Sequence, residues 1–170
     1  MGRLVRLIER VSGATGVLAA WLVAFLVLAI GYEVFSRYVL GAPTLWAFEL
    51  GYMLMGANFL LGAAYTLREG AHIRIDLFYG RLRPRARAWI DLAAYAVLLL
   101  PFTVWLTVGL WGKTRIAFAS LERSGNSAWN PVIWPYRAIF CLAFLLLSLQ
   151  IVAEVVKCVQ ALRAPRAEAG

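Results

Sequence analysis

Residues that hold metals or redox groups are scarce in this sequence. It contains a single histidine, His72, and two cysteines, Cys141 and Cys158, which form no CxxC pair. A membrane haem needs paired axial ligands, and a zinc or iron–sulfur site needs several Cys or His side chains at ligand spacing. We therefore expect no metal and no other cofactor, and the composition disfavours a four-helix redox protein.

Motifs for catalysis are missing as well. The apolar segments hold no Ser and His pair for hydrolysis inside a membrane, and the chain has no glycine-rich phosphate loop. The sequence therefore predicts that the chain is not an enzyme.

Charge is also sparse, because only 15% of residues are charged whereas 62% are hydrophobic, more than a soluble domain tolerates. A helix needs about 20 apolar residues to cross the hydrocarbon core of a membrane. Its backbone N–H and C=O groups then form hydrogen bonds with one another, because lipid offers them no partner. Four uncharged stretches reach that length with their apolar flanks. We predict an all-α membrane protein, one domain of residues 1–170 with four transmembrane helices at about 11–34, 46–68, 90–113 and 134–156.

The basic residues predict how these helices are oriented. With four crossings, twelve of the 17 basic residues fall on the side of the two termini and five on the other. Cytoplasmic loops carry the excess of Lys and Arg, so both termini are predicted to be cytoplasmic. Topology accounts for the net charge of +8, and no nucleic-acid partner is expected. The twelve are Arg3, Arg6, Arg10, Arg68, Arg74, Arg81, Arg83, Arg85, Arg87, Lys157, Arg163 and Arg166, and the five are Arg37, Lys113, Arg115, Arg123 and Arg137.

The first apolar run follows three arginines, as in a secretory signal. Its length of about 22 residues, the lack of a clear cleavage site and the three later spans favour a retained helix instead. Ahead of it, apolar residues at positions 4, 7, 8 and 11 recur at helical spacing, with the arginines on another face. This pattern indicates either a short N-terminal amphipathic helix on the membrane surface or a simple basic flank.

Acidic residues lie near the outer ends of the first two spans. Glu33 and Arg37 are four positions apart, a spacing that allows them to pair across one helical turn. Glu49 lies about one turn into the second helix, after Trp46 at the interface. A carboxylate there gains from the helix dipole but also needs a partner, and Arg37 is the nearby candidate.

A stripe of small and polar residues follows the second helix, at Gly51, Met55, Asn58, Gly62 and Tyr65. Small residues allow close backbone approach, and an amide can bond across helices, so we expect this stripe to face protein rather than lipid. Packing within the chain and contact with another subunit both remain open.

The segment after the second span contains Arg68, His72 and Asp76. His72 and Asp76 either pair at helical spacing or alternate outward in an extended strand. The arginine-rich run at 81–87 indicates a basic cytoplasmic surface segment beside anionic lipid headgroups, between spans two and three.

The loop at 113–137 is the longest on the predicted periplasmic side. It contains Arg115, Arg123, Trp129 and Trp134, which indicate either docking of a partner protein or ordinary interfacial anchoring. Within the third span, Pro101 predicts a kink.

Several of these features together resemble the small transmembrane subunit of tripartite ATP-independent periplasmic (TRAP) transporters, the DctQ-like family. The resemblance covers nearly the whole chain and combines the four spans with an ordered series of short motifs. They are Phe35-Ser36-Arg37-Tyr38, Trp46, Glu49, Gly62, Arg68, Ala71-His72-Ile73-Arg74-Ile75-Asp76, Trp129-Asn130-Pro131 and Trp134-Pro135.

The resemblance implies an accessory subunit of the bacterial inner membrane, surrounded by membrane lipids. It would scaffold a large permease subunit during sodium-coupled uptake of an organic acid that a periplasmic substrate-binding protein delivers. Candidate interface or structural polar residues are Arg37, Trp46, Glu49, Gly51, Asn58, Gly62, Arg68, His72 and Asp76, and candidate periplasmic docking residues are Arg115, Arg123, Trp129 and Trp134.

A self-sufficient small multidrug-type exporter, working as a homodimer, is the alternative. Such proteins are shorter and carry an acidic group well inside the first span, whereas Glu33 lies at its end.

Overall fold

The computed structural model describes residues 2–70 and 83–163. Four helical rods in it are long and apolar enough to cross a membrane, which confirms the predicted all-α membrane fold. Their elements are α1 (Arg3–Tyr38), α2 (Ala47–Arg68), the continuous series α4 (Pro84–Ala93), η1 (Ala94–Leu99) and α5 (Leu100–Ala119), and α6 (Trp134–Arg163).

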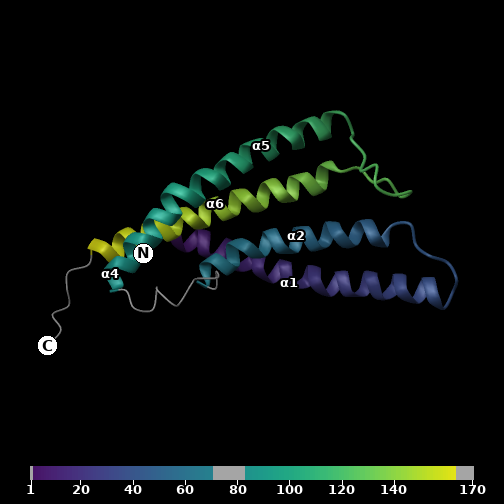
Figure 1. Cartoon of the computed structure of the whole chain (residues 1–170), viewed down its shortest axis with the longest axis horizontal. Coiled ribbons are helices and arrows are strands. Elements are labelled where there is room, and N and C mark those ends of the chain that lie inside the picture. Colours follow the sequence, from purple (N-terminus) through teal and green to yellow (C-terminus); the bar gives the residue numbers. More distant parts are fainter. Residues whose placement is uncertain (1, 71–82, 164–170) are drawn as a thin grey trace.

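The rods form two antiparallel pairs, α1 with α2 and α5 with α6. Helices α2 and α6 join the pairs at the centre, while α4 lies beside the last turns of α6. Figure 1 shows the pairs close together near the chain termini and farther apart near the interhelical loops. We call these the terminal end and the hairpin end.

The amphipathic segment predicted ahead of the first span is helical, but it is continuous with that span. No proline interrupts α1, and Val5 and Ile8 are buried against Ala153 of α6. Leu4 and Leu7, predicted on the same apolar face as Ile8, are instead 67% and 58% exposed. One side of the first turns of α1 therefore packs against α6, and the other side is exposed.

Glycines allow α1 and α2 to pack closely. A Cβ atom on Gly16 would lie 2.5 Å from Cγ of Tyr65 and 2.9 Å from its Cβ, too near for any side chain there. On α2, Gly51 lies against Ile30, and Gly62 faces Ala19. The glycines of the predicted stripe thus pack within the chain, as small residues do between membrane helices.

Two members of the stripe have other surroundings. Met55 is 65% exposed, so this member of the stripe does not face another part of the chain. Asn58 is half-buried. The opposite side of α2 meets α6, where a Cβ on Gly56 would lie 2.7 Å from the hydroxyl oxygen of Tyr136.

The third span contains an irregular segment where Pro101 predicted a kink. Proline has no N–H to bond to the carbonyl four residues earlier, so an α-helix cannot pass through it with all bonds made. The chain forms the π-helix η1 just before this position, and Thr103 donates its hydroxyl to the carbonyls of Leu99 (2.9 Å) and Leu100 (3.2 Å). The disturbance is accommodated by wider backbone turns and a side-chain hydrogen bond.

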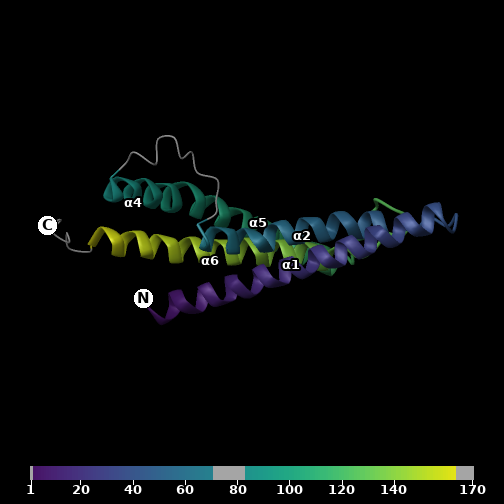
Figure 2. The ribbon, with the colours of Figure 1, turned by 90° about the horizontal axis from the view of Figure 1, so that it is seen from below.

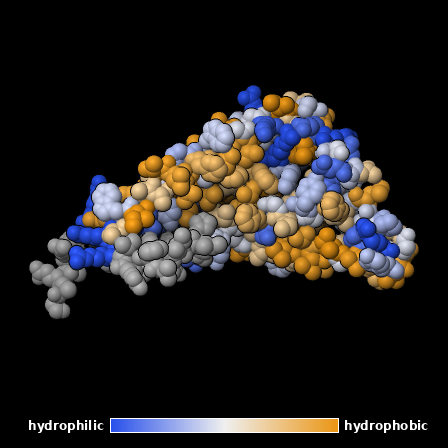
Figure 3. Space-filling view, viewed as in Figure 1, coloured by the Kyte–Doolittle hydropathy of each residue, from blue (hydrophilic) through white to orange (hydrophobic). Residues whose placement is uncertain are grey.

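Hydrophobic side chains cover the outside of the rods. On the face seen in Figure 3, hydrophobic surface lies between hydrophilic groups at the two ends. In the most apolar stretches of α1 and of the third span, only 11% of residues are buried. Most of this surface is therefore available to lipid or to another membrane protein.

Candidate functional site

Charged residues of the described chain lie toward the ends of the rods. The central parts of the four spans, at 11–32, 50–67, 92–112 and 138–153, contain none. The contacts of the charged side chains consequently form two groups, one at the hairpin end and one at the terminal end.

At the hairpin end, Glu33 closes the turn between α1 and α2. Its Oε1 accepts a hydrogen bond from Nε of Arg37 at 2.8 Å, and its Oε2 accepts from the backbone N–H of Thr44 at 2.9 Å and from the Thr44 hydroxyl. The predicted pairing of Glu33 with Arg37 is confirmed. Trp46 stacks on Tyr32 with ring centroids 6.0 Å apart, which adds an aromatic contact to the same turn.

Glu49 does not pair with Arg37, and that prediction is wrong. The carboxylate is fully buried and accepts hydrogen bonds from the hydroxyls of Ser127 and Tyr52, the latter at 3.2 Å. The side-chain amide of Asn126 donates to the same Tyr52 oxygen at 3.2 Å. Neutral donors on α2 itself and on a distant loop satisfy Glu49, while Arg37 is held by the nearer Glu33.

These bonds attach the loop 120–133 to the start of α2. The loop is a short hairpin, with N–H of Ser124 bonded to the carbonyl of Pro131 (3.0 Å) and N–H of Ile133 bonded to that of Glu122 (2.9 Å). Arg123 and Val132 form an isolated β-bridge across it. We refer to residues 120–133 as the hairpin.

The four predicted docking residues all lie at this end. Within the hairpin, Arg123 donates to the carbonyl of Asn130 at 3.0 Å, and Trp129 is 41% exposed. Trp134 packs edge-on against Phe118, with ring centroids 5.2 Å apart. Trp134 and the exposed Arg115 line a groove of about 800 Å³ on the α5–α6 pair.

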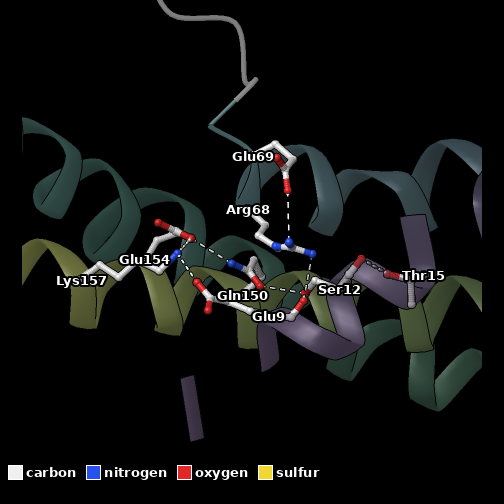
Figure 4. Close-up of polar contacts among 8 residues, drawn as sticks. All are labelled: Glu9, Ser12, Thr15, Arg68, Glu69, Gln150, Glu154 and Lys157. Atoms are coloured by element: carbon white, nitrogen blue, oxygen red, sulfur yellow. Dashed lines mark hydrogen bonds and ion pairs between the residues drawn. The ribbon is translucent and has the colours of Figure 1, made fainter. Parts of the chain in front are cut away.

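A network that the sequence did not reveal occupies the terminal end (Figure 4). Ser12 donates to Oε1 of Gln150 at 2.7 Å, and Nε2 of Gln150 donates to Glu154 at 2.9 Å. Nζ of Lys157 lies 2.7 Å from carboxylate oxygens of both Glu154 and Glu9. Gln150, Glu154 and Lys157 are four and three positions apart, so they lie on one face of α6. This spacing is the feature of the sequence that could have predicted the network.

Arg68 connects α2 to α1 at the terminal end. Its Nη1 donates to the carbonyl of Glu9 at 3.2 Å, its Nη2 lies 3.4 Å from Glu69, and its guanidinium lies 5.8 Å from the ring centroid of Tyr65. Gly13 permits this approach, since a side chain there would collide with the guanidinium. His72, Asp76 and Arg81 fall outside the described residues.

Within residues 2–70 and 83–163, no three His, Cys, Asp or Glu side chains gather where they could hold a metal ion. Cys141 is buried, and its thiol donates to the carbonyl of Thr107 at 3.6 Å. The polar groups at both ends therefore join helices and loops to one another.

Comparison with known proteins agrees with this arrangement. Residues 26–161 match the family model described as tripartite ATP-independent periplasmic transporters, DctQ component. The sialic acid TRAP transporter small permease protein SiaQ of Vibrio cholerae serotype O1 is 27% identical over 120 residues, covering 70% of this chain and 69% of that protein. No solved structure matches the chain. With four membrane-spanning rods and a family match over most of its length, the chain belongs to the DctQ family of TRAP transporter subunits.

Proposed function

We propose that the chain is the non-catalytic small membrane subunit of a TRAP-type secondary transporter. It acts as one four-helix domain of residues 1–170 in the bacterial inner membrane and scaffolds a large permease subunit. A periplasmic substrate-binding protein docks transiently on the assembly. The uptake that this assembly performs is coupled to sodium.

The observation that carries the proposal is the position of the charges. Transport sites for ions and anionic substrates need polar or charged groups near the middle of the membrane. In the described chain the charged groups lie toward the helix ends, where the carboxylates of Glu9, Glu33 and Glu49 contact another helix or a loop. This favours a scaffolding role for the chain, with the transport sites in the large subunit.

The same observation disfavours the homodimeric exporter. That mechanism requires a carboxylate inside the membrane that is free to exchange a cation with a substrate. Glu33 instead lies in the last turns of α1 and is bonded to Arg37 and Thr44.

The relative supports a proposal for the substrate class. The name of the Vibrio relative specifies sialic acid for that protein. We propose an organic acid for the transporter that contains this chain. The large subunit and the binding protein select it, because the described residues here include no buried cationic site for a carboxylate.

Co-purification tests the proposal. The tagged full-length chain is extracted from its native membranes in a mild detergent, and the proteins retained with it are identified by mass spectrometry. The expected result is a multispan permease in equal amount. A lone homodimer that binds cationic drugs would overturn the proposal and favour the exporter.

Substitutions on separate exposed faces locate the contact. Trp21 on α1, Phe59 on α2 and Trp105 on α5 are each at least 70% exposed, so replacing one of them by alanine leaves the fold of the chain intact. We expect one face to lose the permease while the other two retain it. Equal retention by all three would contradict a helix-face interface at these positions.

A further inference from the structure

The first turns of α1 present three different faces. Val5, Ile8 and Ser12 point into the bundle and are buried. Arg3, Arg6 and Arg10, at spacings of three and four, form one exposed row. A second exposed row, adjacent to the arginines, is apolar and begins with Leu4, Leu7 and Val11.

The arginines line two neighbouring hollows. One, of about 390 Å³, is lined by Arg3, Arg6, Leu7 and Arg10. The other, of about 250 Å³, lies between the ends of α1 and α2 and is lined by Arg6, Glu9, Arg10 and Arg68. Arg6 and Arg10 belong to both, so these two side chains are the centre of a basic site.

The charges at this site favour an anion. Among the described residues, no acidic side chain bonds to Arg3, Arg6 or Arg10. The Glu9 carboxylate is held by Lys157 at 2.7 Å. Arg68 is fixed across α1 by its bond to the Glu9 carbonyl and lies 3.4 Å from Glu69, the one acidic side chain beside a guanidinium of this site among the described residues (Figure 4). The site therefore retains an excess of positive charge, with guanidinium groups that match phosphate geometry.

The apolar row indicates what carries the phosphate. From Leu4, Leu7 and Val11 it continues to Leu18 and Phe25 at heptad spacing, and all five are 39–67% exposed. It leads from the arginines directly into the membrane-spanning part of α1. A ligand with a phosphate at one end and hydrocarbon chains at the other would contact both rows.

We propose that Arg6, Arg10 and Arg68 bind the phosphodiester headgroup of an anionic phospholipid, whose acyl chains lie along the exposed apolar row of α1. Arg3 adds attraction at the rim. The lipid occupies the corner between α1 and α2 at the terminal end and so extends the contacts that Arg68 makes across that corner.

Native mass spectrometry of the purified full-length chain provides the test. Palmitoyl-oleoyl phosphatidylglycerol is titrated against palmitoyl-oleoyl phosphatidylcholine, which has the same acyl chains but no net charge. We expect one phosphatidylglycerol to be retained in preference, with affinity that falls as salt rises. The Arg6→Gln/Arg10→Gln variant should bind it about thirtyfold more weakly, from the interaction energy of two basic residues near a membrane anion.

Matched variants make the result decisive. Arg115→Gln/Arg163→Gln removes the same charge from exposed positions elsewhere and should bind like the wild type, while Arg6→Lys/Arg10→Lys should restore most of the binding at an unchanged melting temperature. Equal retention of both lipids, or equal loss in the matched variant, would overturn the proposal. Displacement of the lipid by millimolar inorganic phosphate would assign the site to a free anion and overturn it as well.

Discussion

Glu49 illustrates how a membrane helix accommodates a buried carboxylate without a cation. Its oxygens accept hydrogen bonds from Ser127 and Tyr52, and Tyr52 in turn accepts from Asn126. Every described partner is neutral, so the carboxylate joins α2 to the hairpin without drawing a charged side chain into the bundle. Hydrogen bonds to a charged group are stronger than those between neutral groups, which favours this arrangement over a neutral acceptor.

We therefore expect Glu49→Ala to release the hairpin. The substitution leaves the half-buried hydroxyl of Ser127 without its acceptor, and the open form should become about five- to thirtyfold more populated. Trypsin cleavage after Arg123 in detergent measures the opening. Leu45→Ala, at a nearby position that is 64% exposed, should leave the cleavage rate unchanged, and equal rates in both variants would contradict a clamp at Glu49.

The contact between Ser12 and Gln150 makes a second prediction at this scale. Gln150→Leu should destabilise the bundle by roughly 1 kcal/mol, since hydrogen bonds between membrane helices average less than that and rarely exceed about 1.7 kcal/mol. Combining it with Ser12→Ala should cost less than the two single changes added together, because no unpaired hydroxyl remains. Unfolding in mixed detergent micelles gives all four free energies of the cycle, and strict additivity would exclude the interaction.

Among the helices, α1 is the clearest case in which close packing on a neighbour requires a glycine. Gly16 faces the base of the Tyr65 side chain, which cannot swing aside because its own Cβ would be in contact. Gly31 lies on the same helix, and a Cβ atom added there would meet nothing within 4 Å. Both are helical glycines, so alanine has the same intrinsic advantage at each.

Gly16→Ala should consequently weaken the packing of α1 on α2, with a cost of about 1–3 kcal/mol for a side chain forced into a close contact. Gly31→Ala should be neutral or stabilising by up to about 1 kcal/mol, the helix preference of alanine over glycine. Thermal unfolding of the two variants in the same detergent provides the comparison. If both melt alike, the close approach at Gly16 is not what holds these helices together.

At the scale of the whole molecule, α1 begins and α6 ends at the terminal end, opposite the hairpin. The excess of basic residues predicts that the terminal end is cytoplasmic. In a Cys141→Ala/Cys158→Ala background, a membrane-impermeant maleimide added to intact spheroplasts should label Asn126→Cys and leave Gly2→Cys unlabelled until the membrane is opened. The reverse pattern would invert the topology.

Features that depend on one segment were predictable from the sequence, and those that join distant segments were not. Uncharged length was sufficient for the four spans, and the spacing of four was sufficient for Glu33 and Arg37. Ser127 lies 78 positions from Glu49, and Gln150 lies 138 from Ser12. Those contacts form because the fold brings the hairpin against α2 and α6 against α1. No local sequence pattern predicts that arrangement.

The π-helical segment Ala94–Leu99 also bears on how the third span can change in length. Its bonds join residues five apart instead of four, so the turn contains a residue that an α-helix would not need. Deleting one residue from ordinary helix would rotate everything beyond it by about 100° and turn α5 away from α6. Deleting one from this segment would instead restore α-helical pitch and leave α4 and α5 facing α6 as before. The third span should therefore tolerate the deletion of one residue from Ala94–Leu99, the segment just before Pro101.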